Sequence, residues 1–423
     1  MEIYNRININ EICKKVCSGG TPKSTHTEYY GGNIPWLNTK EVDFNRIYKT
    51  EKNITESGLE NSSAKWIEPN AIIVAMYGAT AGKTAIAKIP LTTNQACCNL
   101  MVDENKADYR FVYYALCDDY IRLASMANGG AQQNLNAQQI KDFDIPYPPL
   151  PTQQKIANIL SSLDDKIEVN RRINEQLEEL AQALFKSWFV DFEPFKDGEF
   201  VDSELGMIPK GWKVGTFSNV VDSTLGGDWG KENLQGNYAK EVFCIRGADI
   251  PEIKNGNRGK MPIRYILEKN FAKKSLANND LVVEISGGSP TQSTGRVCRV
   301  TSELLEKYNN SLICTNFCRA IKPFADYSAY IYYYWQYLYD QGTMFNYENG
   351  TTGIKNLMIN DILDKEPIVI PPINIVEQYK DVVETFAIKI QKNGEEIEKL
   401  TTLRDTLLPK LMSGEIDVNE VEI

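Results

Sequence analysis

The most suggestive chemistry in the sequence is a glycine-rich stretch, YGATAGKT at residues 77–84, which ends in Gly-Lys-Thr. A phosphate-binding P-loop has a glycine, four residues and then Gly-Lys-Ser/Thr, because a loop of that length lets consecutive backbone N–H groups surround a phosphate ahead of a helix. Here three residues separate Gly78 from Gly82, and Tyr77 stands where the first glycine should be. The loop is one residue too short for a P-loop. A nucleotide-binding enzyme therefore remains an alternative, which the other features of the sequence must support or exclude.

The histidine and cysteine residues do not have the number and spacing that metal sites and catalytic triads need. His26 is the only histidine and lies between two threonines, so a Ser-His-Asp triad or an HExxH zinc site has nothing to build on. The cysteines are odd in number and lack a CxxC pair, which argues against a disulfide framework and against zinc. They occupy positions 13, 17, 97, 98, 117, 244, 298, 314 and 318. We expect reduced, buried thiols and no metal.

Length and composition indicate a protein of several domains. The 423 residues suggest two or three domains, and a hydrophobic share of 42% is enough to form their cores. No stretch reaches the roughly 18 uncharged apolar residues of a membrane span. The start, MEIYNRININEICKK, has no apolar signal core. We therefore expect a cytoplasmic protein.

An internal repeat is the most informative feature of the chain. IPWLNTKEV at 34–42 matches VFCIRGADI at 242–250, and NAIIVAMYG at 70–78 matches NDLVVEISG at 279–287. Three further pairs follow in the same order, TTNQACCNL with CTNFCRAI, DYRFVYYAL with DYSAYIYYY, and QQNLNAQQI with IKNLMINDI. At the place of the Gly-Lys-Thr loop the second copy reads SGGSPTQSTGR, without a Lys-Ser/Thr pair. The copies share a turn rather than a phosphate site.

Each copy ends in a heptad pattern that predicts a long coiled-coil helix. In the first helix the seam positions are Ile156, Leu160, Leu163, Ile167, Asn170, Asn174, Leu177, Ala181, Leu184 and Trp188. In the second they are Tyr379, Val383, Phe386, Ile390, Asn393, Ile397, Leu400, Arg404, Leu407 and Leu411. We expect the two helices to pair antiparallel, with buried asparagines at Asn170 and Asn393 fixing the register.

The repeat and the helices together predict an α+β fold of pseudo-twofold dumbbell form. Two similar mixed α/β domains, over residues 1–150 and 214–372, are expected to be separated by two long antiparallel coiled-coil helices. The helices are predicted over 151–195 and 373–414, with a linker over 196–213 and a tail over 415–423.

Charge is distributed unevenly, although the net charge is -10. The helical segments 151–206 and 376–423 hold 6 basic against 12 acidic residues and 6 against 11. By contrast, 231–300 holds 12 basic against 7 acidic residues, and 14–90 holds 10 against 7. Locally basic domains fit contacts to DNA phosphates, and a pair of ordinary solvated faces is the alternative.

The helical junctions carry a resemblance to a known family. The stretch IPYPPLPTQQKIANILSSLDDKIEVNRRINEQLEELAQALFKSWFVDFEPF at 145–195, followed by DSELGMIPKGWKV at 202–214, closely resembles the specificity subunit of type I restriction-modification systems. The resemblance covers almost the whole chain and identifies 1–150 and 214–372 as target recognition domains. The second helix departs from the family pattern, which weakens the expectation that subunits dock through it.

The resemblance implies a subunit without catalytic activity of its own. Each recognition domain would read one half of a bipartite double-stranded DNA site, and the helices would set the gap and dock two methyltransferase subunits. S-adenosylmethionine would be bound by those partners, and ATP with Mg by restriction (translocase and endonuclease) subunits; no cofactor is expected in this chain. A DPPY or NPPY methyltransferase motif is not found. The alternatives are a coiled-coil scaffold without DNA affinity and an enzyme that uses the Gly-Lys-Thr loop.

Candidate DNA contacts follow from loop position and from residue types that bind phosphates or base edges. In the first copy they are Asn38, Thr39, Lys40, Tyr77, Thr80, Lys83, Thr84, Gln132, Gln133 and Asn134. In the second copy they are Arg246, Ser289, Gln292, Ser293, Arg296, Thr351, Thr352 and Lys355. The aromatic stripe Phe185, Trp188, Phe189 and Phe192 is expected to pack against protein, in the core or at a subunit docking face.

Overall fold

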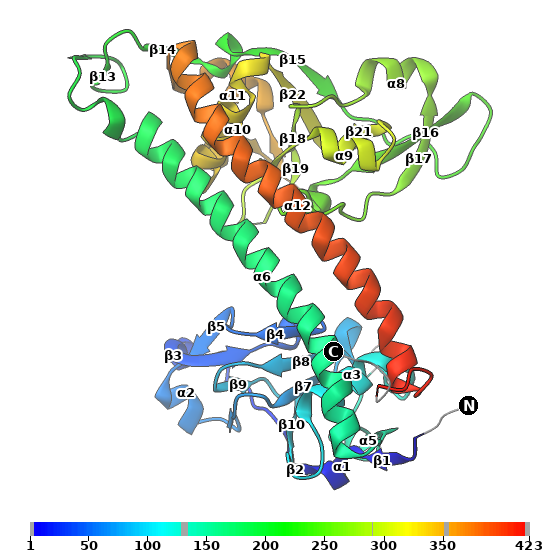
Figure 1. Ribbon diagram of the computed structural model, residues 1–423. Helices are drawn as coiled ribbons and strands as arrows, with labels where there is room; N and C mark the ends of the chain where they lie inside the picture. Colours follow the sequence, from blue (N-terminus) through cyan, green and yellow to red (C-terminus); the bar gives the residue numbers. More distant parts are fainter. Residues whose placement is uncertain (1–3, 128–133, 290, 351–354, 419–423) are drawn as a thin grey trace. The chain divides into compact units, whose positions relative to one another are not determined.

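The computed structural model (Figure 1) describes residues 4–127, 134–289, 291–350 and 355–418. The chain divides into two compact units. Unit 1 combines Met1–Lys166 with Leu400–Ile423, and unit 2 is Ile167–Lys399. Both boundaries fall inside long helices, α6 (Leu150–Phe189) and α12 (Ile373–Met412), so each helix contributes to both units.

Unit 1 contains two sheets, with strand orders β2-β10-β7-β8-β4 and β5-β3-β9-β6. The central strand β7 (Ile72–Ala75) is apolar and buried at every position, as expected of a strand covered on both faces. The other strands are β2 (Cys13–Ser18), β3 (Tyr30–Leu37), β4 (Asn45–Ile47), β5 (Lys52–Ile54), β6 (Trp66–Ile67), β8 (Thr84–Ala87), β9 (Leu91–Thr93) and β10 (Cys97–Val102). A separate pair joins β1 (Arg6–Asn8) to β11 (Asp144–Pro146).

Unit 2 repeats this arrangement, with strand orders β15-β22-β18-β20 and β17-β16-β21. Its central strand β18 (Leu281–Glu284) is also buried at every position. The other strands are β15 (Val221–Gly226), β16 (Tyr238–Ile245), β17 (Ile263–Leu267), β20 (Val297–Arg299), β21 (Leu312–Cys314) and β22 (Cys318–Pro323). Short pairs join β14 (Lys213–Thr216) to β25 (Pro367–Ile370), and β24 (Lys355–Leu357) to β19 (Ser286–Gly287) and β23 (Glu348–Asn349).

The two units share strand pairing down to the residue register. Antiparallel Cys97 and Ala75 in unit 1 correspond to Cys318 and Glu284 in unit 2. The parallel pairs correspond as well, because β3 and β9 meet at Trp36 and Thr92, and β16 and β21 meet at Cys244 and Ile313. The internal repeat predicted from the sequence is therefore a repeat of the backbone framework.

Helices cover the sheets of each unit in the same order. In unit 1 these are α3 (Tyr109–Asp118) and α5 (Ala137–Lys141), and in unit 2 they are α10 (Ser328–Asp340) and α11 (Ile359–Lys365). Asp108 caps the N-terminus of α3, because its side chain accepts a hydrogen bond of 2.8 Å from the Arg110 N–H. Aromatic side chains of α10, including Tyr330 and Trp335, lie fully buried in the core of unit 2.

Within unit 2, α6 and α12 run side by side and antiparallel (Figure 1). The Tyr379 hydroxyl donates to the Ala181 carbonyl oxygen at 3.2 Å, and Asn393 Nδ2 donates to Asn174 Oδ1 at 2.8 Å. Every predicted seam position is buried or half-buried, so the seam is confirmed. The buried Asn170 donates to Glu396 at 2.8 Å instead of meeting another asparagine.

In unit 1 an ion pair and a hydrogen bond hold the other ends of these helices. Arg404 Nη1 of α12 donates to Asp164 Oδ1 of α6 at 2.7 Å, and the Tyr114 hydroxyl of α3 donates to Asp164 Oδ2 at 2.6 Å. The same carboxylate thus ties both helices to the domain. The predicted α+β fold, with two similar domains and paired helices, is confirmed.

A close backbone approach explains a glycine inside α12. Gly394 lies against Gly256, in the loop after α7 (Ile250–Lys254) of unit 2, and a Cβ atom at residue 394 would overlap the backbone of Gly256. Glycine is unfavourable in a helix interior. The glycine at residue 394 is therefore explained by the close packing against Gly256 and not by helix propensity. Within the described segments, no helix carries the apolar length that a membrane span needs.

Candidate nucleic-acid interface

The Gly-Lys-Thr stretch forms a strand–turn–strand hairpin. It joins β7 to its antiparallel neighbour β8, where a P-loop would lead into a helix. Ala75 N–H donates to the Lys83 carbonyl at 2.9 Å, and Gly82 N–H donates to the Ala75 carbonyl at 2.8 Å. The geometry excludes the P-loop alternative and supports the turn that the repeat predicted.

The same hairpin recurs in unit 2. Glu284 N–H donates to the Arg296 carbonyl at 2.8 Å, and Gly295 N–H donates to the Glu284 carbonyl at 2.9 Å. Lys83 and Arg296 therefore occupy equivalent backbone positions, directly before β8 and β20. The two copies place a cation at the same position before the second strand of the hairpin, although the connecting loop is longer in unit 2.

A second candidate segment joins the hairpin in each unit through backbone contacts. In unit 1, Tyr77 and Asn134 form an antiparallel bridge, and Leu135 N–H donates to the Met76 carbonyl at 2.8 Å. In unit 2, β19 pairs with β24, which places Ser286 opposite Asn356 and Gly287 opposite Lys355. The structure thus brings together segments that are far apart in the sequence.

The third candidate segment starts at equivalent residues, Asn38 and Arg246, each capping a short 3-10 helix. Asn38 N–H donates to Glu41 Oε1 at 2.8 Å, and Arg246 N–H donates to Asp249 Oδ2 at 3.0 Å. Burial alone would raise the pKa of Asp249, but hydrogen bonds from Arg246 and from the Lys260 N–H outweigh it and hold the pKa below its ordinary value. The Asp249 carboxylate is therefore charged at neutral pH.

Every candidate cation in the described residues is paired with a carboxylate of its own unit. The pairs are Lys40 with Glu51 at 2.5 Å, Lys83 with Asp43 at 2.6 Å, Arg246 with Asp249 at 2.9 Å, Arg296 with Glu284 at 2.6 Å, and Lys355 with Glu348 at 2.8 Å. Such pairing orients the cations and compensates their charge.

Some predicted contacts are wrong. Thr84 is 0% exposed and Ser293 is 4% exposed, so neither is displayed on a loop surface. Thr84 is already the first residue of β8, and its hydroxyl lies 3.3 Å from the Cys117 sulfur. Asn38, Thr39, Lys40, Tyr77, Thr80, Lys83, Asn134, Arg246, Ser289, Gln292, Arg296 and Lys355 keep exposed or half-exposed positions. The candidates Gln132, Gln133, Thr351 and Thr352 lie outside the described residues.

Burial affects the cysteine thiols in the sheet of unit 1. All nine cysteines are free. Burial raises the pKa of the Cys13 and Cys98 thiols to about 12, so they stay protonated and unreactive at neutral pH. Among the described residues, no cluster of His, Cys, Asp and Glu side chains could hold a metal ion.

Comparison with known proteins identifies the family. The profile described as "Type I restriction modification DNA specificity domain" matches residues 1–179. The specificity subunit of type I restriction enzyme MjaIX from Methanocaldococcus jannaschii is 32% identical over 426 residues, covering 96% of this chain and 92% of that one. This chain belongs to the type I restriction specificity subunits.

Two further comparisons agree with this membership. The HindI specificity subunit of Haemophilus influenzae is 24% identical and covers 91% of this specificity subunit and 94% of its own length. The crystal structure of the type I restriction-modification S subunit from M. genitalium superposes with a TM-score of 0.54, over 97% of this chain and 96% of that chain, at 17% identity. At that identity the superposition supports the fold.

The aromatic stripe of this specificity subunit is mainly core. Phe185 and Phe189 are 1% exposed, packed against Tyr330 and Tyr379, so they are wrong as docking residues. Trp188 and Phe192 are half-buried. They contact further aromatic rings of unit 2: Phe195 and Tyr379 for Trp188, and Phe200 and Trp212 for Phe192. The expectation of protein contact is confirmed for the stripe.

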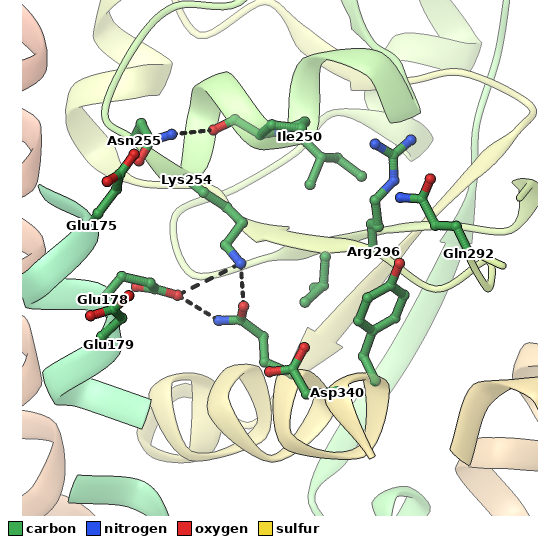
Figure 2. Close-up of a pocket in the computed structure, with 13 residues that line it drawn as sticks. Glu175, Glu178, Glu179, Ile250, Lys254, Asn255, Gln292, Arg296 and Asp340 are labelled. Carbon is green, nitrogen blue, oxygen red and sulfur yellow. Dashed lines mark hydrogen bonds and ion pairs between the residues drawn. The ribbon is translucent and has the colours of Figure 1, made fainter. Parts of the chain in front are cut away.

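In unit 2 of the specificity subunit, the hairpin borders a cavity of about 400 Å³. Figure 2 shows Gln292 and Arg296 on one side and three glutamates of α6, Glu175, Glu178 and Glu179, on the other. Glu178 accepts hydrogen bonds from Gln336 Nε2 at 2.6 Å and from the Tyr332 hydroxyl at 3.1 Å. These bonds hold α6 against α10 beside the candidate loops.

Sequence reasoning missed the carboxylates that hold the loop cations. Glu284 carried a signal, because it is the one charged residue in the apolar stretch LVVEI at 281–285. Asp249 stands three residues after Arg246, the spacing of a cap. Asp43 is 40 residues from Lys83, and nothing in the sequence joins the two.

Proposed function

We propose that this specificity subunit is a non-catalytic reader of a bipartite duplex DNA site, with each unit binding one half through its three candidate segments. The observation that carries the proposal is the shared register: both units present a cap segment, a hairpin and a bridging strand at equivalent backbone positions. Asn, Gln, Thr, Lys and Arg on such segments are the types that contact phosphates and base edges.

Catalysis is assigned to partners in this proposal. S-adenosylmethionine would be bound by two methyltransferase subunits, and ATP with Mg by restriction subunits, while α6 and α12 dock the partners and set the gap between half-sites. Exposed apolar side chains on the two helices of unit 2, Leu180, Val382 and Ile388, support a protein-docking role. Trp188 and Phe192, at and just after the C-terminal end of α6, are also partly exposed.

The test is the methylation pattern of a host that carries this chain with its methyltransferase subunit. Sequencing of methylated bases should give two short specified blocks separated by an unspecified gap. Tyr77→Ala in unit 1 should alter one block, and Gln292→Ala in unit 2 should alter the other, because both side chains are exposed on the hairpins.

A host with the methyltransferase subunit and without this chain supplies the control and should show no such motif. A single continuous motif would contradict the proposal. So would variants that each alter both blocks, because the two units would then not read separate halves.

A further inference from the structure

Glu284 is a buried carboxylate at the meeting point of the unit 2 loops. It ends the central strand β18, and its side chain is 7% exposed. Oε2 accepts a hydrogen bond of 2.8 Å from Arg296 Nε, and Oε1 accepts one of 2.6 Å from Nη2. Gly247, directly after the cap residue Arg246, encloses the same carboxylate, because a Cβ atom at 247 would collide with Oε1. The carboxylate thus holds the guanidinium in one orientation.

This clamp uses only one edge of the guanidinium. Nε and one proton of Nη2 are engaged by Glu284, which leaves Nη1 and the second Nη2 proton on the terminal edge. Within the described part of the chain, Arg296 makes no hydrogen bond through that edge. The edge is a planar pair of donors with the spacing of a bidentate contact.

The surroundings favour a neutral acceptor over a phosphate. Arg296 lines the cavity together with Gln292, while four carboxylates line the rest, Glu175, Glu178, Glu179 and Asp340. Against them stand Lys254, which is paired with Glu178 at 3.8 Å, and Arg296 itself, whose charge Glu284 already compensates. The net negative charge of these side chains would repel a phosphate, whereas a base edge is neutral and would not be repelled in this way.

Among the base pairs, guanine offers two adjacent acceptors, O6 and N7, in the major groove, and a bidentate arginine is their usual partner. We propose that Arg296, clamped by Glu284, reads a guanine in the half-site bound by unit 2. The inference rests on the proposed function and names a specificity residue and its positioning residue.

The equivalent position of unit 1 lacks the clamp. Lys83 stands where Arg296 stands, and Ala75 stands where Glu284 stands. Lys83 pairs instead with Asp43, whose side chain is 66% exposed. An ammonium is a point charge without a fork, so the inference assigns the guanine to one half-site only.

The experiment compares methylation motifs of wild type, Arg296→Lys and Glu284→Gln, each produced with the methyltransferase subunit. Arg296→Lys keeps the charge and removes the fork. The preference for guanine at one position of one block should fall by about 5- to 150-fold, which corresponds to the about 1–3 kcal/mol of a bidentate contact. Glu284→Gln should weaken the same preference at the same position, since an amide cannot accept both guanidinium bonds. The other block should stay unchanged.

Arg299→Lys is the matched control. Arg299 is also clamped by a carboxylate, with Nη1 and Nη2 at 2.6 and 2.9 Å from the oxygens of Glu384 on α12, and lies outside the loops. Its loss should lower stability without changing the motif. Thermal unfolding of all variants separates folding from reading.

Failures of the two proposals are distinguishable. A bipartite wild-type motif without guanine in either block overturns the inference and leaves the proposed function standing. So does a motif that Arg296→Lys leaves unchanged in a folded protein. Absence of a bipartite motif in the wild type overturns the proposed function itself.

Discussion

Two residues at equivalent backbone positions, Lys83 and Arg296, differ in how firmly they are held. Arg296 is bound through two atoms to a buried carboxylate, whereas Lys83 is bound through one atom to an exposed one. An exposed ion pair contributes about 0–1 kcal/mol and is weakened by salt. Asp43 is therefore easily exchanged for another anion, and Lys83 is suited to a phosphate.

Lys83→Ala should accordingly weaken DNA binding by a similar factor for all sequences, and reduce the slope of log K against log salt by about 1. Binding of the complex to duplexes with and without the target site, at several salt concentrations, measures both quantities. Asp43→Asn is the opposed control, because it frees Lys83 and should not weaken binding. A change of target motif in Lys83→Ala would contradict a phosphate role.

At this scale the sequence predicted segments that the fold brings together, but not which of their side chains reach the surface. Thr84 and Ser293 are residue types that suit a DNA contact, but Thr84 is the first residue of β8 and is fully buried, and Ser293 is buried as well. The partner carboxylates were missed because pairs such as Asp43 and Lys83 depend on the tertiary fold. Residue type alone does not reveal a partner 40 positions away.

At one residue of α12, helix propensity and tertiary packing favour different amino acids. Alanine stabilises a helix interior relative to glycine by about 1 kcal/mol, so propensity favours Gly394→Ala. Overpacking against a backbone that cannot rotate away costs about 1–3 kcal/mol, and the obstacle at residue 394 is the backbone of Gly256.

We expect the packing cost to prevail, so Gly394→Ala should lower the free energy of unfolding of the chain by up to about 2 kcal/mol. Urea unfolding followed by circular dichroism measures it. Lys392→Ala, exposed on the same helix, should change stability by no more than about 0.5 kcal/mol. A Gly394→Ala variant more stable than wild type would show that α12 and the Gly256 loop are not in close contact.

Heptad spacing predicted the helices and their seam well, because a seam leaves a periodic trace in the sequence. It did not predict that Asn393 would meet Asn174, since spacing fixes a face and not a partner. Parallel pairing of β3 with β9 and of β16 with β21 was equally invisible, because those strands lie far apart in the chain.

For the whole molecule, the proposed spacing role of the helices predicts the effect of lengthening them. Four residues inserted after Lys166 in α6 and four after Lys399 in α12, at the boundaries between units, add about 6 Å of helix to each. At about 3.4 Å per base pair, the gap in the methylation motif should grow by nearly two base pairs while both blocks stay the same.

The control is a four-residue insertion after Leu205, in an exposed loop of unit 2 that belongs to neither helix. It should leave the gap unchanged. Altered blocks with an unchanged gap, in the variant with lengthened helices, would show that reading and spacing are not separate tasks of the chain.

Some of the contacts that hold the candidate loops against the sheets are made by main-chain atoms alone. Leu135 to Met76 and Leu357 to Ile285 are N–H to carbonyl bonds, and so are the hairpin bonds of Lys83 and Arg296. Side-chain substitutions at neighbouring positions, such as the exposed Tyr77 in one copy and the half-buried Ser286 in the other, leave these main-chain bonds in place. Mutational drift can therefore explore new target sequences at little risk to folding, and one half of the target can change while the other is inherited intact.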